Sequence, residues 1–118
     1  MKTLYESILS STGSGRAAFP NGAYKIGDIL VTVFSYSMTI PSFYQVVGLK
    51  GKTTIVVKEL AKKSVSGNGW QGEEVPVKDE FIKGAKEINV RIVNGTPKID
   101  KLIARKWDGQ PVAYDHLD

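Results

Sequence analysis

The chain has 118 residues, a formal net charge of +4 and a pI of about 9.3. These values predict one mildly basic globular domain that is large enough to bury its own core. It contains no cysteine, so disulfides, thiol catalysis, cysteine-ligated zinc and iron–sulfur clusters are excluded. No apolar run approaches the roughly 20 residues of a membrane span, and no apolar signal segment follows the N-terminal lysine. These absences favour a cytoplasmic protein without membrane association.

The first 23 residues differ in composition from the rest of the chain. In residues 2–11 apolar side chains recur four positions apart, which is the spacing of a short amphipathic helix. Residues 12–23 are rich in Gly, Ser and Ala and predict a loop. We therefore expect an N-terminal arm of helix and loop over residues 1–23, followed by the main domain over residues 24–118.

Three consecutive strands are predicted at the start of the main domain. Residues 29–34 are apolar on both alternating faces, as in a central strand or a barrel wall. A loop over 37–42 leads to a second strand over 43–50. Lys50-Gly51 suits a tight hairpin because glycine tolerates positive φ, and the β-branched residues of 53–60 predict the third strand.

The second half is less regular. Residues 66–74 are predicted to be a loop from their glycine content, and 75–86 an irregular segment with at most one helical turn. Residues 88–93 alternate between apolar and polar and predict a strand with Ile88, Val90 and Ile92 inward. Asn94-Gly95 is a hairpin signal, with 98–107 as the returning strand.

About five short strands at near-regular spacing predict a mainly β protein. We expect a small antiparallel barrel of the SH3-like kind, or a strongly bent sheet, with the short N-terminal helix attached. An OB-type barrel is less favoured because no helix is expected between the third and fourth strands.

Several short motifs together resemble a family of small proteins encoded by bacteriophages and mobile elements. They read Gly-Asp-Ile at 27–29, Phe-Tyr-Gln-Val-Val at 43–47, Pro to Gly at 76–84 and Trp-Asp-Gly-Gln-Pro with a later Tyr at 107–114. The family often has a Trp-Gly-Tyr-Asp-Gln-Thr-like stretch where this chain has Phe-Ser-Tyr-Ser-Met-Thr at 34–39. The family has no established activity, so the resemblance implies a phage or mobile-element setting and no mechanism.

No group of residues predicts a catalytic or metal site. His116 is the only histidine and lies three positions from the chain end, which suits neither a zinc site nor a general base. The carboxylate pairs at 73–74 and 79–80 consist of adjacent residues, which face opposite sides of a strand. The glycine-rich stretches at 13–16 and 48–52 lack the strand-to-helix setting of a phosphate loop. We expect a protein that is not an enzyme and needs no cofactor or metal.

Charged and aromatic side chains supply the candidate binding residues. Five lysines and one glutamate fall within 50–63, a pattern typical of contact with phosphates or an acidic protein, and equally of a strand edge protected against aggregation. Exposed aromatics of small barrels stack bases or dock peptides, although Phe43 and Trp107 are expected to plug the barrel ends. The candidate partner-binding residues are Tyr36, Tyr44, Lys50, Lys52, Lys62, Lys63, Trp70 and Arg105, with the loops 35–42 and 67–72 as the binding face.

Three functions fit these observations. The first is a phage-like accessory protein that inhibits or modulates a host protein of an antiviral system, as an anti-CRISPR does, or of a nucleic-acid-processing system. The second is a nucleic-acid-binding module that uses the lysines with Arg105 and Lys106, against which the modest net charge and the acidic residues at 73–80 count. The third is capture of a small anionic nucleotide ligand. The oligomeric state is left open.

Overall fold

Residues 20–68 and 70–116 are described by the computed structural model. The helix expected in residues 2–11, and residues 12–19 of the expected loop, lie outside these ranges. The elements are η2, a 3₁₀ turn (Pro20–Ala23), β1 (Ile29–Ser35), β2 (Thr39–Lys50), β3 (Thr54–Gly67), β4 (Gln71–Phe81), β5 (Ile88–Val93), β6 (Thr96–Ile99), β7 (Leu102–Ile103), β8 (Arg105–Lys106) and β9 (Val112–Asp115). In this described part of the chain, no helix has the length and apolar character needed to cross a bilayer.

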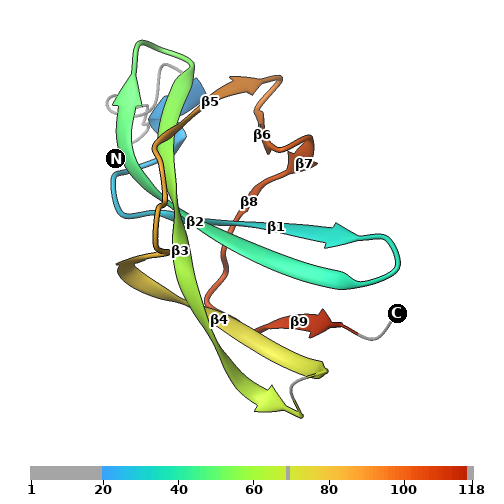
Figure 1. The fold of residues 1–118 in the computed structure, drawn as a ribbon. Helices are drawn as coiled ribbons and strands as arrows, with labels where there is room; N and C mark the ends of the chain where they lie inside the picture. The colour runs from blue at the N-terminus through green and yellow to red at the C-terminus, as the bar shows by residue number, and fades with distance from the viewer. Residues whose placement is uncertain (1–19, 69, 117–118) are drawn as a thin grey trace, which may run out of the picture.

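The strands form one antiparallel sheet that bends until it closes on itself (Figure 1). β2 pairs with β3, β3 with β4, β4 with β9, and β9 again with β2. These four strands make a closed antiparallel barrel. β1 and β8 continue the sheet beyond β2, while β5, β6 and β7 continue it beyond β3. The expectation of a mainly β protein with a small antiparallel barrel is confirmed, and a hairpin with no helix joins β3 to β4.

The bending has a local cause in the long strands β2 and β3. The register shifts once between β2 and β3, at Val46/Gly48, and twice between β3 and β4, at Leu60/Lys62 and Ser64/Ser66. Each such irregularity bends the strand and increases its twist. Strands of 12 and 14 residues therefore curve enough for one sheet to wrap into a barrel and still extend past it.

The sheet buries apolar side chains on both faces. Leu30 and Tyr44 pack on one face in the larger cluster, whereas Val31 and Phe43 pack on the other with Leu60. This agrees with the predicted two-sided strand at 29–34. Phe43 is fully buried, and the half-buried ring of Trp107 meets it edge-on at 6.2 Å between centroids. Val90 and Ile92 point inward as predicted.

The prediction of an irregular segment over 75–86 is wrong in its first half, because β4 continues to Phe81. Pro76 and a run of charged residues are poor strand formers, so the composition of this segment does not predict a strand. Asp79 interrupts its geometry with a φ of 65°. The buried amide of Gln45 compensates: its Nε2 donates to Asp79 Oδ1 (2.8 Å) and its Oε1 accepts from Asp79 N (2.9 Å).

Three further boundaries differ from the prediction. β2 begins at Thr39 and includes Pro41, so the expected loop over 37–42 shrinks to a tight turn. The expected loop over 66–74 is a hairpin tip between β3 and β4. The expected single strand over 98–107 is divided into β6, β7 and β8. The break between β6 and β7 falls where Asp100 and Lys101 both adopt positive φ, at 51° and 68°.

Residues 20–23, which the sequence assigned to the arm, pack against the main domain. Asn21 is buried, and its Nδ2 donates to the carbonyls of Gly51 (3.2 Å) and Thr54 (3.1 Å). One amide therefore holds the turn between β2 and β3 in place.

Candidate functional site

Two hairpin tips and the end of β9 lie side by side at one edge of the barrel (Figure 1). Asp115 of β9 pairs with Thr39, which follows the β1–β2 tip, and with Gln71, which follows the β3–β4 tip. β9 therefore fixes the two tips relative to each other. We call this edge the tip face; its described residues are Tyr36, Ser37, Met38, Asn68, Trp70, Asp115 and His116.

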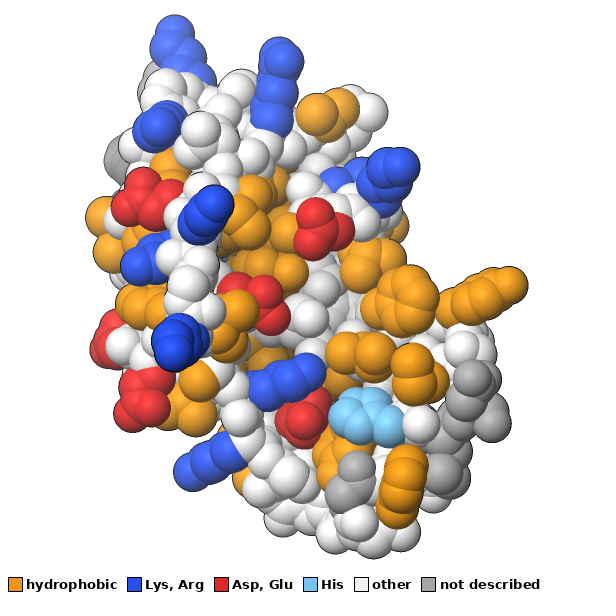
Figure 2. Space-filling view, viewed as in Figure 1, with side chains coloured by type: hydrophobic (Ala, Val, Ile, Leu, Met, Phe, Trp, Pro, Cys, Tyr) orange, Lys and Arg blue, Asp and Glu red, His pale blue; other side chains and the backbone are white. Residues whose placement is uncertain are grey.

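The tip face presents two exposed aromatic side chains. Tyr36 is 88% exposed and Trp70 is 60% exposed, and both are among the candidate partner-binding residues predicted from the sequence. Figure 2 shows hydrophobic side chains gathered on this side of the molecule around the histidine. Exposed aromatics grouped on one face mark interaction surfaces more often than scattered ones do.

Hydrogen bonds from two neighbouring segments hold the backbone around Trp70. The side-chain Oδ1 of Asn68 accepts from the backbone N of Trp70 and of Gln71, each at 3.0 Å. The Trp70 carbonyl accepts from the His116 backbone N at 2.7 Å. The His116 ring in turn lies 5.1 Å from the Tyr114 ring. The backbone position of Trp70 at the tip is therefore fixed by its neighbours.

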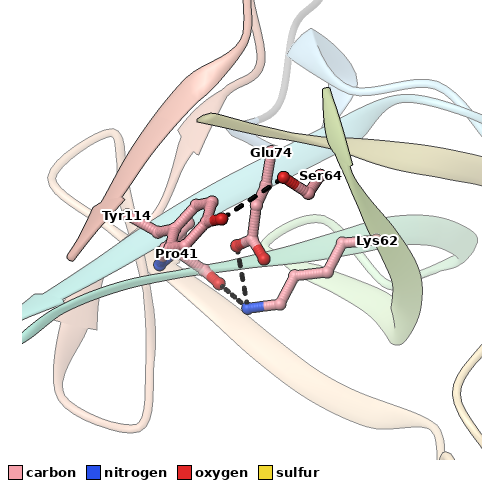
Figure 3. A network of polar contacts seen from close by, with 5 residues as sticks. All are labelled: Pro41, Lys62, Ser64, Glu74 and Tyr114. Carbon is pink, nitrogen blue, oxygen red and sulfur yellow. Dashed lines mark hydrogen bonds and ion pairs between the residues drawn. The ribbon is translucent and has the colours of Figure 1, made fainter. Parts of the chain in front are cut away.

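Under the tip face, a polar network ties together the four strands of the barrel (Figure 3). Lys62 of β3 donates to the Pro41 carbonyl of β2 at 2.6 Å and lies 3.3 Å from Glu74 Oε1 of β4. The hydroxyls of Ser64 in β3 and Tyr114 in β9 are hydrogen bonded at 3.3 Å. Glu74 Oε1 is buried and makes no hydrogen bond, so its link to the ammonium group is Coulombic.

We expect Lys62→Met to lower the free energy of unfolding by about 1–3 kcal/mol, because it leaves the Glu74 carboxylate, whose side chain is 11% exposed, without its counter-charge. Replacing both residues, Lys62→Met with Glu74→Leu, is expected to recover much of this loss. Urea unfolding of both single variants and the double variant measures the coupling. Losses that simply add would contradict this ion pair.

The structure does not bring the eight predicted binding residues together. Lys50 and Lys52 flank the β2–β3 tip, and Lys62 is used inside the barrel. Lys62 lies ten positions after Lys52, and ten residues of an extended strand span about 33 Å. Lys63 and Arg105 are exposed on β3 and on β8.

Tyr44 lies inside the fold and not on a surface. It is 5% exposed, and burial raises its pKa. The charges of Glu59 and Asp100 raise the pKa further, whereas side-chain hydrogen bonds to Thr32 and Ser42 lower it.

Lys58, another lysine of the predicted binding segment, also makes a contact within the fold, because it lies over the Phe81 ring at 4.5 Å. Tyr36 and Trp70 are therefore the predicted residues that share a face.

Glu59 gives a pH-dependent prediction. Burial raises the pKa of its carboxyl above the ordinary 4.5, Lys62 opposes this and Asp100 adds to it. As pH rises past 4.5 the unfolded chain ionises first, so folding loses stability until the raised pKa is passed, and the loss persists at neutral pH. Glu59→Gln is therefore expected to match the wild type near about pH 3 and to exceed it at pH 7 by less than about 1 kcal/mol.

Urea unfolding at the two pH values tests this prediction, with the exposed Glu80→Gln as the control. The prediction would be contradicted if Glu59→Gln, compared with the wild type, were less stable at neutral pH than at acid pH.

In the described ranges, no group of three histidine and carboxylate side chains is arranged to hold a metal ion. Comparisons of the chain with protein-family models, with curated proteins and with solved structures give no match.

Two residues that position the tip face, Asn68 and Asp115, were not predicted from the sequence. The Asn68 role had a local signal, because asparagine in tight turns commonly bonds to the backbone that follows. The role of Asp115 had no local sequence signal, because its pairings join segments that are distant in the sequence.

Proposed function

We propose that this protein is a binding module that docks onto another protein through the tip face. The observation that carries the proposal is the placement of Tyr36 and Trp70, both exposed, on two hairpin tips that β9 joins. Tryptophan and tyrosine are the residues that most often dominate protein interfaces, since they bury a large area for little loss of side-chain entropy.

The proposal extends to the biological setting. From the resemblance of its motifs, the chain acts as a phage-like or mobile-element accessory protein in the cytoplasm of the host cell. There it inhibits or modulates a host protein of an antiviral or nucleic-acid-processing system, without catalysis. An SH3-like identity of the barrel belongs to the same proposal, and barrels of that kind bind peptides through aromatic residues.

Nucleic-acid binding is the weaker alternative. Its support is the lysine-rich sequence at 50–63, but Lys62 pairs with Glu74 and Lys58 covers Phe81. A backbone-binding protein needs its cations on one face. Binding of DNA at low salt that weakens steeply as salt rises would favour this alternative.

Affinity purification from host cells with a paired variant tests protein docking. We expect the wild-type chain to retain a stoichiometric host protein, and Tyr36→Ala with Trp70→Ala to lose it. The matched control is Ile26→Ala with Leu49→Ala, which removes exposed apolar side chains elsewhere. Retention of the same protein by the tip-face variant, or recovery of none by the wild type, would count against the proposal.

A further inference from the structure

A second surface is hollowed on the outer side of β5, β6 and β7. The hollow has a volume of about 440 Å³ and is lined by Arg91, Val93, Asn94, Thr96, Lys98 and Ile103. These side chains come from the outward positions of the strands, because their neighbours Val90, Ile92 and Ile99 are buried in the larger core. The size falls in the range of small-molecule sites, roughly 300–1,000 Å³.

Two cations, Arg91 of β5 and Lys98 of β6, line this hollow. Val93 pairs with Thr96 and Ile92 with Pro97, and Arg91 and Lys98 are the next residues beyond these pairs on β5 and β6. Both are exposed and point outward. Like charges on neighbouring strands repel each other, so an anion bound between Arg91 and Lys98 would relieve this repulsion.

No carboxylate lines the hollow. Arg91 and Lys98 form no ion pair with any residue of the described ranges. The carboxylate that follows β6 is Asp100, which is exposed and is not among the side chains that line the hollow. The charged side chains that line the hollow are therefore Arg91 and Lys98, and both are cations.

We propose that this hollow binds a small molecule that carries a phosphate group beside an apolar body. A phosphate monoester carries about −1.5 to −2 charges at neutral pH, which matches two cations, and arginine binds phosphate oxygens through paired N–H donors. Thr96 and Asn94 add a hydroxyl and an amide as further donors. Val93 and Ile103, 57% and 63% exposed, provide the apolar wall, and the volume exceeds what a phosphate group alone would fill.

Phenyl phosphate is a suitable probe because it joins a phosphate to an apolar ring. Titrated into ¹⁵N-labelled protein at low salt, it is expected to give saturable amide shifts at residues 91–96, 98 and 103. Inorganic phosphate is expected to bind more weakly at the same residues, and benzyl alcohol to give no saturable shift. The double variant Arg91→Met with Lys98→Met is expected to weaken binding at least about tenfold, which corresponds to one lost charged hydrogen bond.

Lys86→Met, which removes an exposed lysine from the loop before β5, is the matched control and is expected to bind as the wild type does. All the substituted side chains are exposed, and the ¹⁵N spectra show directly that each variant is folded. Absence of saturable shifts with phenyl phosphate, equal binding by the double variant, or equal binding of benzyl alcohol would overturn the proposal.

Discussion

Phe43→Ala is expected to lower the free energy of unfolding by about 3–5 kcal/mol. Phe43 is 0% exposed and is the largest fully buried side chain of the described residues. It packs with Val31 and Leu60, and its ring makes a T-shaped contact with the Trp107 ring. Truncation would leave a cavity where the barrel strand β2 meets β1, and this loss is a large fraction of the roughly 5–15 kcal/mol that stabilises a typical domain.

Urea or thermal unfolding measures this effect. Phe34→Ala is the matched control, because Phe34 lies on the neighbouring strand β1 and is 44% exposed, so the same truncation removes less buried area. Similar losses for the two variants would contradict the assignment of Phe43 to the centre of this core.

Gly72→Ala is expected to disrupt the β3–β4 hairpin that presents Trp70. A Cβ at this position would lie 2.1 Å from the Ser66 carbonyl oxygen and 2.8 Å from the Gly67 Cα, both backbone atoms. The strands must therefore separate at the tip, at a cost of about 2 kcal/mol or more. The hydrogen bonds around Trp70 depend on this hairpin geometry, so we expect faster amide exchange at residues 70 and 71 together with lower global stability.

The control for this variant is Gly48→Ala on β2. There a Cβ would meet only the Val56 side chain at 3.6 Å, an ordinary contact distance. We expect this control to exchange normally at the β3–β4 tip. Equal protection of residues 70 and 71 in Gly72→Ala and in wild type would show that the tip does not need the close approach of its strands.

The sequence predicts the parts of the fold that rest on local patterns. The two-sided apolar pattern at 29–34, the Lys50-Gly51 turn and the alternation at 88–93 each correspond to a strand or hairpin in the structure. β4 was missed because its stability comes from pairing with β3 and β9 and from the amide of Gln45, and not from its own composition.

The sequence predicted separate parts of the candidate site but not how the fold joins them. Both hairpin tips stood out by their glycines, serines and exposed aromatics, but no pattern indicated that β9 would join them. Likewise the lysines at 50–63 formed a group along the chain, whereas the structure separates them and pairs Lys62 with Glu74. The hollow that Arg91 and Lys98 line depends on the pairing of β5 with β6. The Asn94-Gly95 turn predicted this hairpin but not a binding surface on it.

Site-specific photo-cross-linking in host cells tests the central claim, that the tip face is a protein-binding surface. The photoreactive amino acid p-benzoylphenylalanine would replace Trp70 or Tyr36 in turn, and Leu49, at the other end of β2, as the control. We predict a covalent adduct with one and the same host protein from positions 70 and 36, and none from position 49. Adducts that form equally from position 49, or only with nucleic acid, would contradict the claim.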